Sequence, residues 1–205
     1  SNLGDVGTVV SARPLAPQFW VPGSADATVL TYVTTDAFGK KALSTGTVFT
    51  PRGTAPPGGW PVISWAHGTS GIGDDCAPSV RGPGLPERDL PYLAKWMQQG
   101  YAIVASDYAG LGTPGLHAYL DGRTTAHNVV DMVRAGREFS STRPVAQRLS
   151  RFWAAVGQSQ GGGAAIYTAR YATEFGGEEL DYRGAVGTGT PVSVGSWLGD
   201  SDGSS

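Results

Sequence analysis

Short apolar runs alternate with helical patterns along most of the chain. Four of these runs are bounded by loop-forming residues, as buried parallel strands are. They cover residues 61–66, 102–106, 152–156 and 184–187. Three segments between them place apolar residues at helical spacing. These segments cover residues 90–99, 124–139 and 160–175. Alternating strands and helices indicate βαβ units, so the pattern predicts an α/β fold with a mostly parallel sheet and helices on both of its faces.

Two earlier segments follow a different pattern. Residues 26–35 and 41–50 alternate between the two faces of a strand, with Val29 and Phe49 among the apolar positions. The segment that joins them, residues 36–40, is short and contains a glycine. Two alternating runs joined in this way are typical of a β-hairpin. The pattern therefore predicts an N-terminal antiparallel hairpin that supplies an edge to the sheet.

Composition indicates a globular chain and favours one domain. The chain has 205 residues, of which 40% are hydrophobic and 16% are charged, which is enough to build a sizeable core. The formal net charge is -2 and no basic face is apparent, so we expect no nucleic-acid partner. No apolar run approaches the roughly 20 residues that cross a bilayer. Cys76 is the only cysteine, so this chain cannot close a disulfide on itself.

A candidate nucleophile lies where a predicted strand meets a predicted helix. Residues 157–161 read Gly-Gln-Ser-Gln-Gly, after the strand 152–156 and at the start of the helix 160–175. A serine in such a sharp turn adopts a strained backbone that lifts its hydroxyl above the sheet, while flanking glycines let strand and helix pass closely. Glycine is common in this chain, so the strand and helix carry the interpretation more than the five residues do. We expect Ser159 to be catalytic, and the alternative is a glycine-rich structural turn.

A second loop fits the same chemistry. Residues 67–71, His-Gly-Thr-Ser-Gly, directly follow the strand 61–66. In acyl transfer, two backbone N–H groups stabilise the developing oxyanion: one from the residue after the nucleophile, and one from a loop after an earlier strand. Gln160 has the first position, and we expect Thr69 to have the second. The alternative is a tight turn whose His67 is structural. This chemistry needs no metal and no organic cofactor, and we expect none.

Five blocks of sequence occur in the order found in a known family. They cover residues 64–69, 75–79, 105–115, 157–162 and 189–191. In these blocks the chain resembles the secretory lipases of the α/β-hydrolase superfamily, a group that includes the fungal lipase-A type. The resemblance implies an α/β-hydrolase fold and an extracellular serine hydrolase of acylglycerols or other carboxylic esters, which forms an acyl-enzyme on Ser159. It implies an oxyanion loop near Thr69.

The resemblance also implies partners. They are a lipid or small ester substrate and a lipid interface. The family's cysteine in the block 75–79 is usually disulfide-bonded, which implies that Cys76 pairs with a residue outside this chain.

The chain departs from the family after the serine. In these hydrolases the triad follows the order Ser, then Asp or Glu, then His, with the last two on loops after the final strands. Residues 160–205 leave no room for two further βαβ units of about 30 residues each, and every histidine precedes Ser159. We therefore expect residues 1–205 to be a single, incomplete α/β-hydrolase domain without the lid and the C-terminal catalytic strands. The C-terminal part of the same protein would be its partner, and this chain alone would be inactive.

Other interpretations remain open. One is a rearranged triad, although His127 fits a packing role within its helical pattern better than a catalytic one. Its histidine would be His117 or His127, and its acid would be Asp107, Asp121 or Asp131. A second is a noncatalytic relative that binds acyl ligands or a partner, and a third is a serine peptidase or amidase on the same fold. Residues 196–205, with Trp197 and Leu198, either begin a lid over the acyl site or form a frayed terminus.

Overall fold

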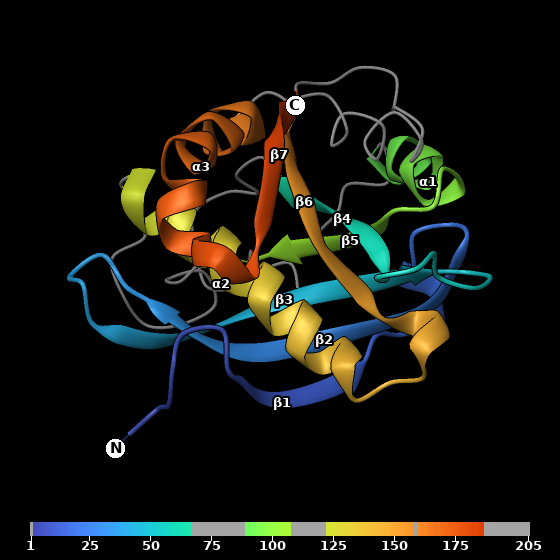
Figure 1. Cartoon of the computed structure of the whole chain (residues 1–205), viewed down its shortest axis with the longest axis horizontal. Helices are drawn as coiled ribbons and strands as arrows, with labels where there is room; N and C mark the ends of the chain where they lie inside the picture. Colours follow the sequence, from blue (N-terminus) through green and yellow to red (C-terminus); the bar gives the residue numbers. More distant parts are fainter. Residues whose placement is uncertain (1, 67–88, 108–121, 158–159, 187–205) are drawn as a thin grey trace, which may run out of the picture.

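The computed structural model describes residues 2–66, 89–107, 122–157 and 160–186. Within these residues, seven strands form one sheet in the spatial order β1-β2-β3-β5-β4-β6-β7 (Figure 1). The strands are β1 (Val9–Pro14), β2 (Ser24–Thr35), β3 (Lys41–Pro51), β4 (Trp60–Ala66), β5 (Ala102–Ser106), β6 (Leu149–Gly157) and β7 (Asp181–Val186). The α-helices of the described ranges are α1 (Leu90–Gln98), α2 (Gly122–Ser141) and α3 (Gln160–Gly176). Short 3-10 helices cover Pro17–Phe19, Val145–Gln147 and Gly177–Glu179. None of the helices in these ranges is long and apolar enough to cross a membrane.

The sheet has an antiparallel part and a parallel part. The first three strands are antiparallel to their neighbours, whereas β5, β4, β6 and β7 are parallel to one another. This confirms the predicted α/β fold with a parallel sheet and a leading hairpin. The strand β5 spans the five residues that its apolar pattern predicts, while β6 and β7 both begin three residues earlier than predicted. Their starts differ because polar residues extend both strands ahead of their apolar runs.

One side chain organises the turn of the predicted hairpin. Thr35 pairs with Lys41 across the ends of β2 and β3. The backbone N–H groups of Phe38 and Lys40 both donate to Asp36 Oδ1, each at 2.9 Å. Aspartate is favoured in turns because its short carboxylate accepts hydrogen bonds from the backbone just ahead of it. The hairpin that the sequence predicts therefore forms, with a turn that is fixed locally.

The edge strand β1 is an element that the apolar pattern did not predict. Every residue of β1 after Val9 is exposed, so the strand carries no alternation of buried and exposed positions. Arg13 and Pro14 lie in this strand, and charge and proline are common protections of a sheet edge against pairing with other chains. The hairpin therefore lies one strand in from the edge, and β1 forms the antiparallel edge.

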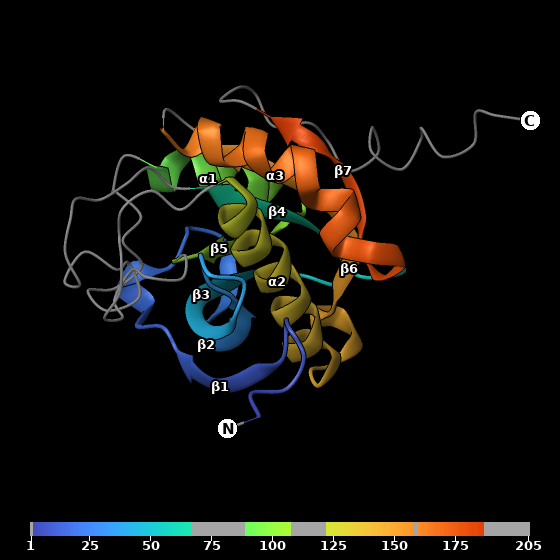
Figure 2. The same ribbon diagram turned by 90° about the vertical axis from the view of Figure 1, so that its left-hand side faces the viewer.

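The sheet separates two apolar cores. Val62 and Trp153 belong to the core beneath α2 and α3, whereas Ile63 and Trp65 belong to the core beneath α1. Successive side chains of a strand point to opposite faces, so an uninterrupted apolar run fills both cores. Figure 2 shows α2 and α3 next to each other on the side of the sheet that faces the viewer, in agreement with their extensive contact. The apolar runs of the sequence are therefore continuous because helices cover both faces of these strands.

A glycine allows the chain to approach β6 closely just before β4 begins. Gly59 has a φ of +103°, and a Cβ there would lie 2.7 Å from the backbone carbon of Leu149 and from the nitrogen of Ser150. Gly58, in the same turn, has a φ of +87° with nothing within 4 Å of its added Cβ. We expect Gly58→Ala to cost about 1–2 kcal/mol of unfolding free energy through its backbone conformation alone. Gly59→Ala should cost a further 1–3 kcal/mol because backbone must move.

Urea unfolding of the two alanine variants measures this difference. The two positions share a turn and a positive φ, so Gly58→Ala is the matched control. Equal losses of stability in the two variants would contradict the close approach that we describe.

Candidate active site

Three parallel strands end at the same level on one edge of the sheet. Ala66, the last residue of β4, pairs with Gly157, the last residue of β6. On the other side of β4, Ser64 pairs with Val104, so β5 ends beside them at Ser106. Loops that follow the carboxyl ends of parallel strands commonly carry binding and catalytic residues. This carboxyl edge is therefore the expected place for a binding or catalytic site.

The helices that follow β4 and β6 cover opposite faces of the sheet. The chain runs from β4 through α1 to β5 on one side, and from β6 through α3 to β7 on the other side. The helix α1 packs in one core, while α3 contributes Ala172 to the other. A position where neighbouring strands are followed by connections in opposite directions is a topological switch point, and ligands of open α/β sheets bind there. The switch point of this sheet lies between β4 and β6.

The strand and helix expected around the nucleophile are both present. β6 ends at Gly157 and α3 begins at Gln160, so only two residues separate strand from helix. Ser159 lies outside the described residues. Gln160 is in the first turn of α3, whose backbone N–H groups have no partner within the helix. A strand and a helix separated by two residues are the surroundings in which a nucleophilic serine is expected.

Several predicted features lie outside the described residues. They are Thr69, Cys76, His117, Asp121 and residues 196–205. Thr69 comes three residues after Ala66, the last residue of β4. Among the described residues, no group of three His, Cys, Asp or Glu side chains could hold a metal ion.

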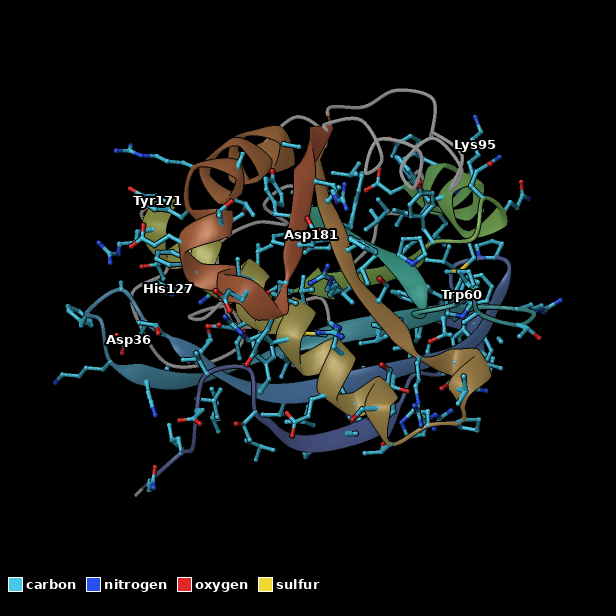
Figure 3. The ribbon with its side chains drawn as sticks, viewed as in Figure 1. Asp36, Trp60, Lys95, His127, Tyr171 and Asp181 are labelled. Carbon is cyan, nitrogen blue, oxygen red and sulfur yellow. The ribbon has the colours of Figure 1, made fainter. Side chains whose placement is uncertain are left out.

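The described members of the rearranged triad have other partners. The ring of His127 stacks on the ring of Phe175, with centroids 3.7 Å apart and planes inclined by 9°, and Figure 3 places it on α2 beside α3. This contact agrees with the predicted packing role. Asp107 is 2% exposed, and its carboxylate accepts a hydrogen bond from Thr45 Oγ1 at 2.6 Å. Both residues therefore take part in holding elements together.

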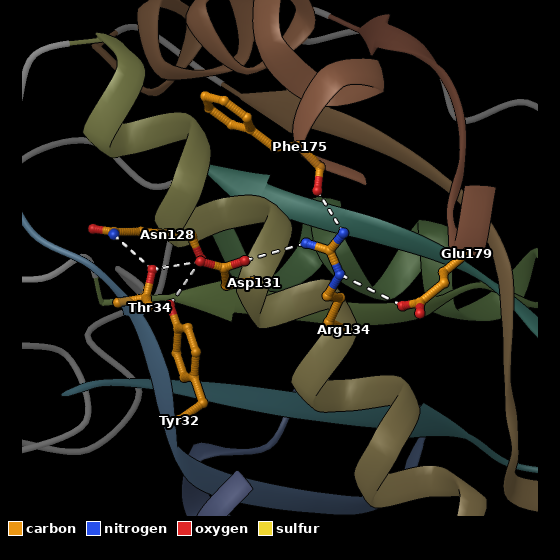
Figure 4. A network of polar contacts seen from close by, with 7 residues as sticks. All are labelled: Tyr32, Thr34, Asn128, Asp131, Arg134, Phe175 and Glu179. Carbon is orange, nitrogen blue, oxygen red and sulfur yellow. Dashed lines mark hydrogen bonds and ion pairs between the residues drawn. The ribbon is translucent and has the colours of Figure 1, made fainter. Parts of the chain in front are cut away.

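Asp131 lies in a buried polar network between the sheet and two helices (Figure 4). Thr34 Oγ1, on β2, donates to Asp131 Oδ2 at 2.8 Å, and Arg134 Nη1 donates to Oδ1 at 3.3 Å. Arg134 Nη2 donates in turn to the backbone oxygen of Phe175 near the end of α3. The sequence spacing Asp131 to Arg134 is that of neighbours on one helix face, but nothing in it revealed the partner on α3. Sequence reasoning considered Asp131 only as a triad acid and missed this network.

Burial dominates the protonation of Asp131. The side chain is 1% exposed, and desolvation raises its pKa from the ordinary value of 3.8 to about 6, against the opposing effects of Thr34 and Arg134. Because the folded pKa is the higher one, this group stabilises the fold fully below pH 3.8 and loses that contribution as the pH rises through 6. The difference corresponds to roughly 3 kcal/mol. At neutral pH the ionised Asp131 is therefore a cost to global stability.

A groove among the described residues lies at the opposite edge of the sheet. It has a volume of about 530 Å³ and lies between the turn 55–59 and the end of α2. Two serines line it, and their hydroxyls donate to main-chain oxygens: Ser140 to Arg137 and Ser141 to Glu138. The groove lies beside the starts of β4 and β6, not their ends. It does not contribute to a site at the carboxyl edge.

Comparison with known proteins gives a family and curated relatives. A family model described as secretory lipase matches residues 86–205. The chain is 28% identical over 205 residues to Lipase A of Moesziomyces aphidis, which covers 95% of this chain and 42% of that protein. It is 29% identical over 201 residues to a Mycobacterium tuberculosis protein named "probable inactive lipase", which covers 91% of this chain and 42% of the relative. The chain therefore spans less than half the length of these relatives.

Solved structures give the same fold. The chain is similar to Candida antarctica lipase A in its closed state, with a TM-score of 0.74 and 26% identity over 96% of this chain and 45% of that one. It is also similar to the rice cell wall degrading esterase LipA from Xanthomonas oryzae, with a TM-score of 0.70 and 25% identity over 89% of this chain and 50% of that one. The fold is an α/β-hydrolase fold. The family model matches more than half of the residues of this chain, and the chain therefore belongs to the secretory lipase family.

Proposed function

We propose that the protein is a secreted serine hydrolase of carboxylic esters, with Ser159 as its nucleophile and a lipid or small ester as its substrate. The observation that supports this most strongly is that Gly157 pairs with Ala66 where β6 and β4 end, while α3 begins at Gln160. Ser159 and the loop from residue 67 therefore follow neighbouring strands at the switch point. Membership of the secretory lipase family supports both ester chemistry and secretion.

Chain lengths at this edge support the two proposed oxyanion donors. Neighbouring strands lie about 4.8 Å apart, and three residues after Ala66 extend at most about 10 Å. The backbone N–H of Thr69 can therefore reach the turn that contains Ser159. Gln160 directly follows the serine, as the first oxyanion donor does in this fold. We assign these two N–H groups to the oxyanion hole.

The proposed reaction has two steps. Ser159 Oγ attacks the ester carbonyl carbon while its proton passes to a histidine, and the tetrahedral oxyanion accepts hydrogen bonds from the Thr69 and Gln160 N–H groups. The bond from the acyl carbon to the alkoxy oxygen then breaks, and the alcohol leaves with the proton from the histidine. Water, deprotonated by the same histidine, attacks the acyl-enzyme and releases the carboxylic acid and free Ser159.

We place the histidine and its acid partner in a C-terminal part of the same protein. No histidine follows Ser159 within the 205 residues, whereas the chain covers only 42% of Lipase A from Moesziomyces aphidis. In this fold the acid and the base follow the nucleophile in the chain. On this proposal, residues 1–205 form one incomplete catalytic domain, and the described sheet is completed by later strands and a lid.

A second candidate is a noncatalytic protein that binds acyl ligands. The observation that favours it is the name of the Mycobacterium tuberculosis relative, a "probable inactive lipase", which is 29% identical to this chain. Such a protein would keep the fold but would not turn over esters. A serine peptidase or amidase is the alternative within enzymes.

A covalent probe and three substrates test the proposal on the full-length protein. We expect a fluorophosphonate to label one peptide, the one that contains Ser159. Short- and long-chain nitrophenyl esters should be hydrolysed, and a peptide amide should not. Labelling at another residue would refute the assigned nucleophile, and faster hydrolysis of the amide would favour a peptidase. Absence of both labelling and turnover would favour the noncatalytic candidate.

A further inference from the structure

The two ends of α3 have different surroundings. Its amino end, at Gln160, follows the candidate nucleophile directly. Near its carboxyl end, the backbone oxygen of Phe175 accepts a hydrogen bond from Arg134 Nη2 on α2 at 2.5 Å. The ring of the same Phe175 stacks with the rings of His127 and Tyr171, with centroid distances of 3.7 and 5.3 Å. The carboxyl end of α3 is therefore fixed to α2 both by stacking and by a guanidinium.

The guanidinium of Arg134 is itself held on two sides. Its Nη1 donates to Asp131 at 3.3 Å, and its Nε lies 3.7 Å from Glu179 Oε2, just after α3. Asp131 is joined to β2 through Thr34, which accepts a hydrogen bond from Asn128 Nδ2 at 3.0 Å. Figure 4 shows this series of contacts running from β2 through α2 to the end of α3. The position of Arg134 is therefore set relative to the sheet.

Global stability does not account for the charge in this network. A buried ion pair is seldom more stabilising than apolar side chains of similar volume, and burial makes the ionised Asp131 unfavourable at neutral pH. The guanidinium does supply geometry, because its planar donors have fixed directions and can hold several acceptors at once. Here those donors point to α2, to α3 and to the segment after α3. The arrangement therefore suits a role in fixing the positions of these three elements relative to one another.

We propose that Arg134, held by the carboxylate of Asp131, is a positioning residue for ester hydrolysis: it fixes the carboxyl end of α3 and thereby orients the amino end that carries the Gln160 N–H. This inference rests on the function proposed above. A helix of 17 residues is about 25 Å long, so a small tilt at one end displaces the other. A misplacement of about 1 Å at reacting atoms can lower a rate 100-fold.

Kinetics of variants of the full-length protein test the proposal. Active sites are counted with a fluorophosphonate in a separate sample, so that kcat of the unlabelled enzyme for a nitrophenyl ester is expressed per site able to react with the probe. We expect Arg134→Gln to lower kcat per labelled site by about 10- to 100-fold with KM changed less than about twofold. Arg134→Lys should recover only part of kcat, because one ammonium group cannot reach all three partners.

Arg137→Gln is the matched control. Arg137 lies one turn later on the same helix, and its Nη1 donates to the backbone oxygen of Glu179, outside α3. We expect the kcat of the Arg137→Gln variant, per site able to react with the probe, to stay within about twofold of the kcat of the unmodified protein.

Asp131→Asn gives a second readout that depends on pH. The groups that face Asp131 are Thr34 and Tyr32 from β2, and Asn128 and Arg134 from α2, with Glu179 beyond the guanidinium. We expect Asp131→Asn to lower kcat at pH 8 without lowering the midpoint of thermal unfolding. The unmodified protein should lose additional kcat as the pH falls through 6, and the variant should lack that component. The base histidine titrates in both proteins, so the difference between the two profiles isolates Asp131.

The outcomes separate this inference from the proposed function. Unchanged kcat per labelled site in both Arg134→Gln and Asp131→Asn would overturn the positioning role and leave the nucleophile assignment intact. A fall only in the number of labelled sites would show that the network merely supports folding, which also overturns the inference. Failure of the unmodified protein to react with the probe would instead refute the proposed function. If Arg134→Gln does not fold, the pH profiles of Asp131→Asn decide the question.

Discussion

Replacing Ser159 with alanine in the full-length protein is expected, on the proposed function, to lower kcat for ester hydrolysis by about a million-fold, as loss of the nucleophile does in serine hydrolases. A factor of this size corresponds to roughly 8 kcal/mol of lost transition-state stabilisation. The Oγ atom is removed, so the proposed acyl-enzyme cannot form, while the two backbone N–H groups proposed for the oxyanion hole are kept. Steady-state hydrolysis of a nitrophenyl ester measures the loss, and fluorophosphonate labelling should disappear with it.

Ser141→Ala is the matched control for this prediction. Ser141 is exposed at the end of α2, near the opposite edge of the sheet, and its hydroxyl donates only locally, to the backbone oxygen of Glu138 at 2.6 Å. We expect this variant to keep full turnover and full labelling. If Ser159→Ala kept more than about 1% of the turnover, another residue would have to be the nucleophile.

Replacing Trp153 with alanine should cost about 3–5 kcal/mol of unfolding free energy. Trp153 lies on β6 with no exposed surface, in the core beneath α2 and α3, and its ring is 4.8 Å from that of Tyr182 on β7. Its removal would leave a large cavity in the strand that ends at Gly157. Since whole domains are typically stable by only 5–15 kcal/mol, a substantial unfolded fraction is expected. Urea unfolding followed by circular dichroism measures the loss.

Two further variants define the cause of that loss. Phe38→Ala removes an aromatic ring that is 73% exposed in the turn between β2 and β3, and we expect a change within about 0.5 kcal/mol. Trp153→Phe keeps an aromatic ring and removes an indole N–H that has no hydrogen-bond partner among the described residues. It should cost less than half as much as alanine. If Trp153→Phe lost as much unfolding free energy as Trp153→Ala, the indole N–H would have a hydrogen-bond partner.

The parallel half of the fold could be predicted from sequence because burial on both faces leaves a direct signature. The run at residues 102–106 is apolar at nearly every position, since Ile103 faces one core and Val104 the other. The strand β1 left no such signature, because its side chains are mostly exposed and it forms by pairing with β2. Pairing of backbone groups does not depend strongly on the side chains, so an exposed edge strand has little pattern to read.

The candidate site could likewise be predicted from the sequence only in part. A serine between a strand and a helix could be located by local pattern, and the structure puts β6 and α3 on either side of it. Whether β4 and β6 are adjacent depends on the strand order. They are adjacent here because the chain runs from β5 through α2 to β6, on the other side of β4. The contact between Arg134 and the Phe175 backbone is less predictable still. It joins a side chain to a main-chain oxygen 41 positions later, and any residue could supply that oxygen.

The division of the interior by the sheet has a consequence for how this protein can diverge. The helices α3 and α1 pack against separate sets of side chains on opposite faces of the sheet. Substitutions in one of these two layers therefore have little effect on the packing of the other. Drift in the layer that contains α1 could therefore alter the segment after β4 while the packing of α3 stays constant. On the proposed function, a lineage built in this way can change the esters it selects without rebuilding the part that cleaves them.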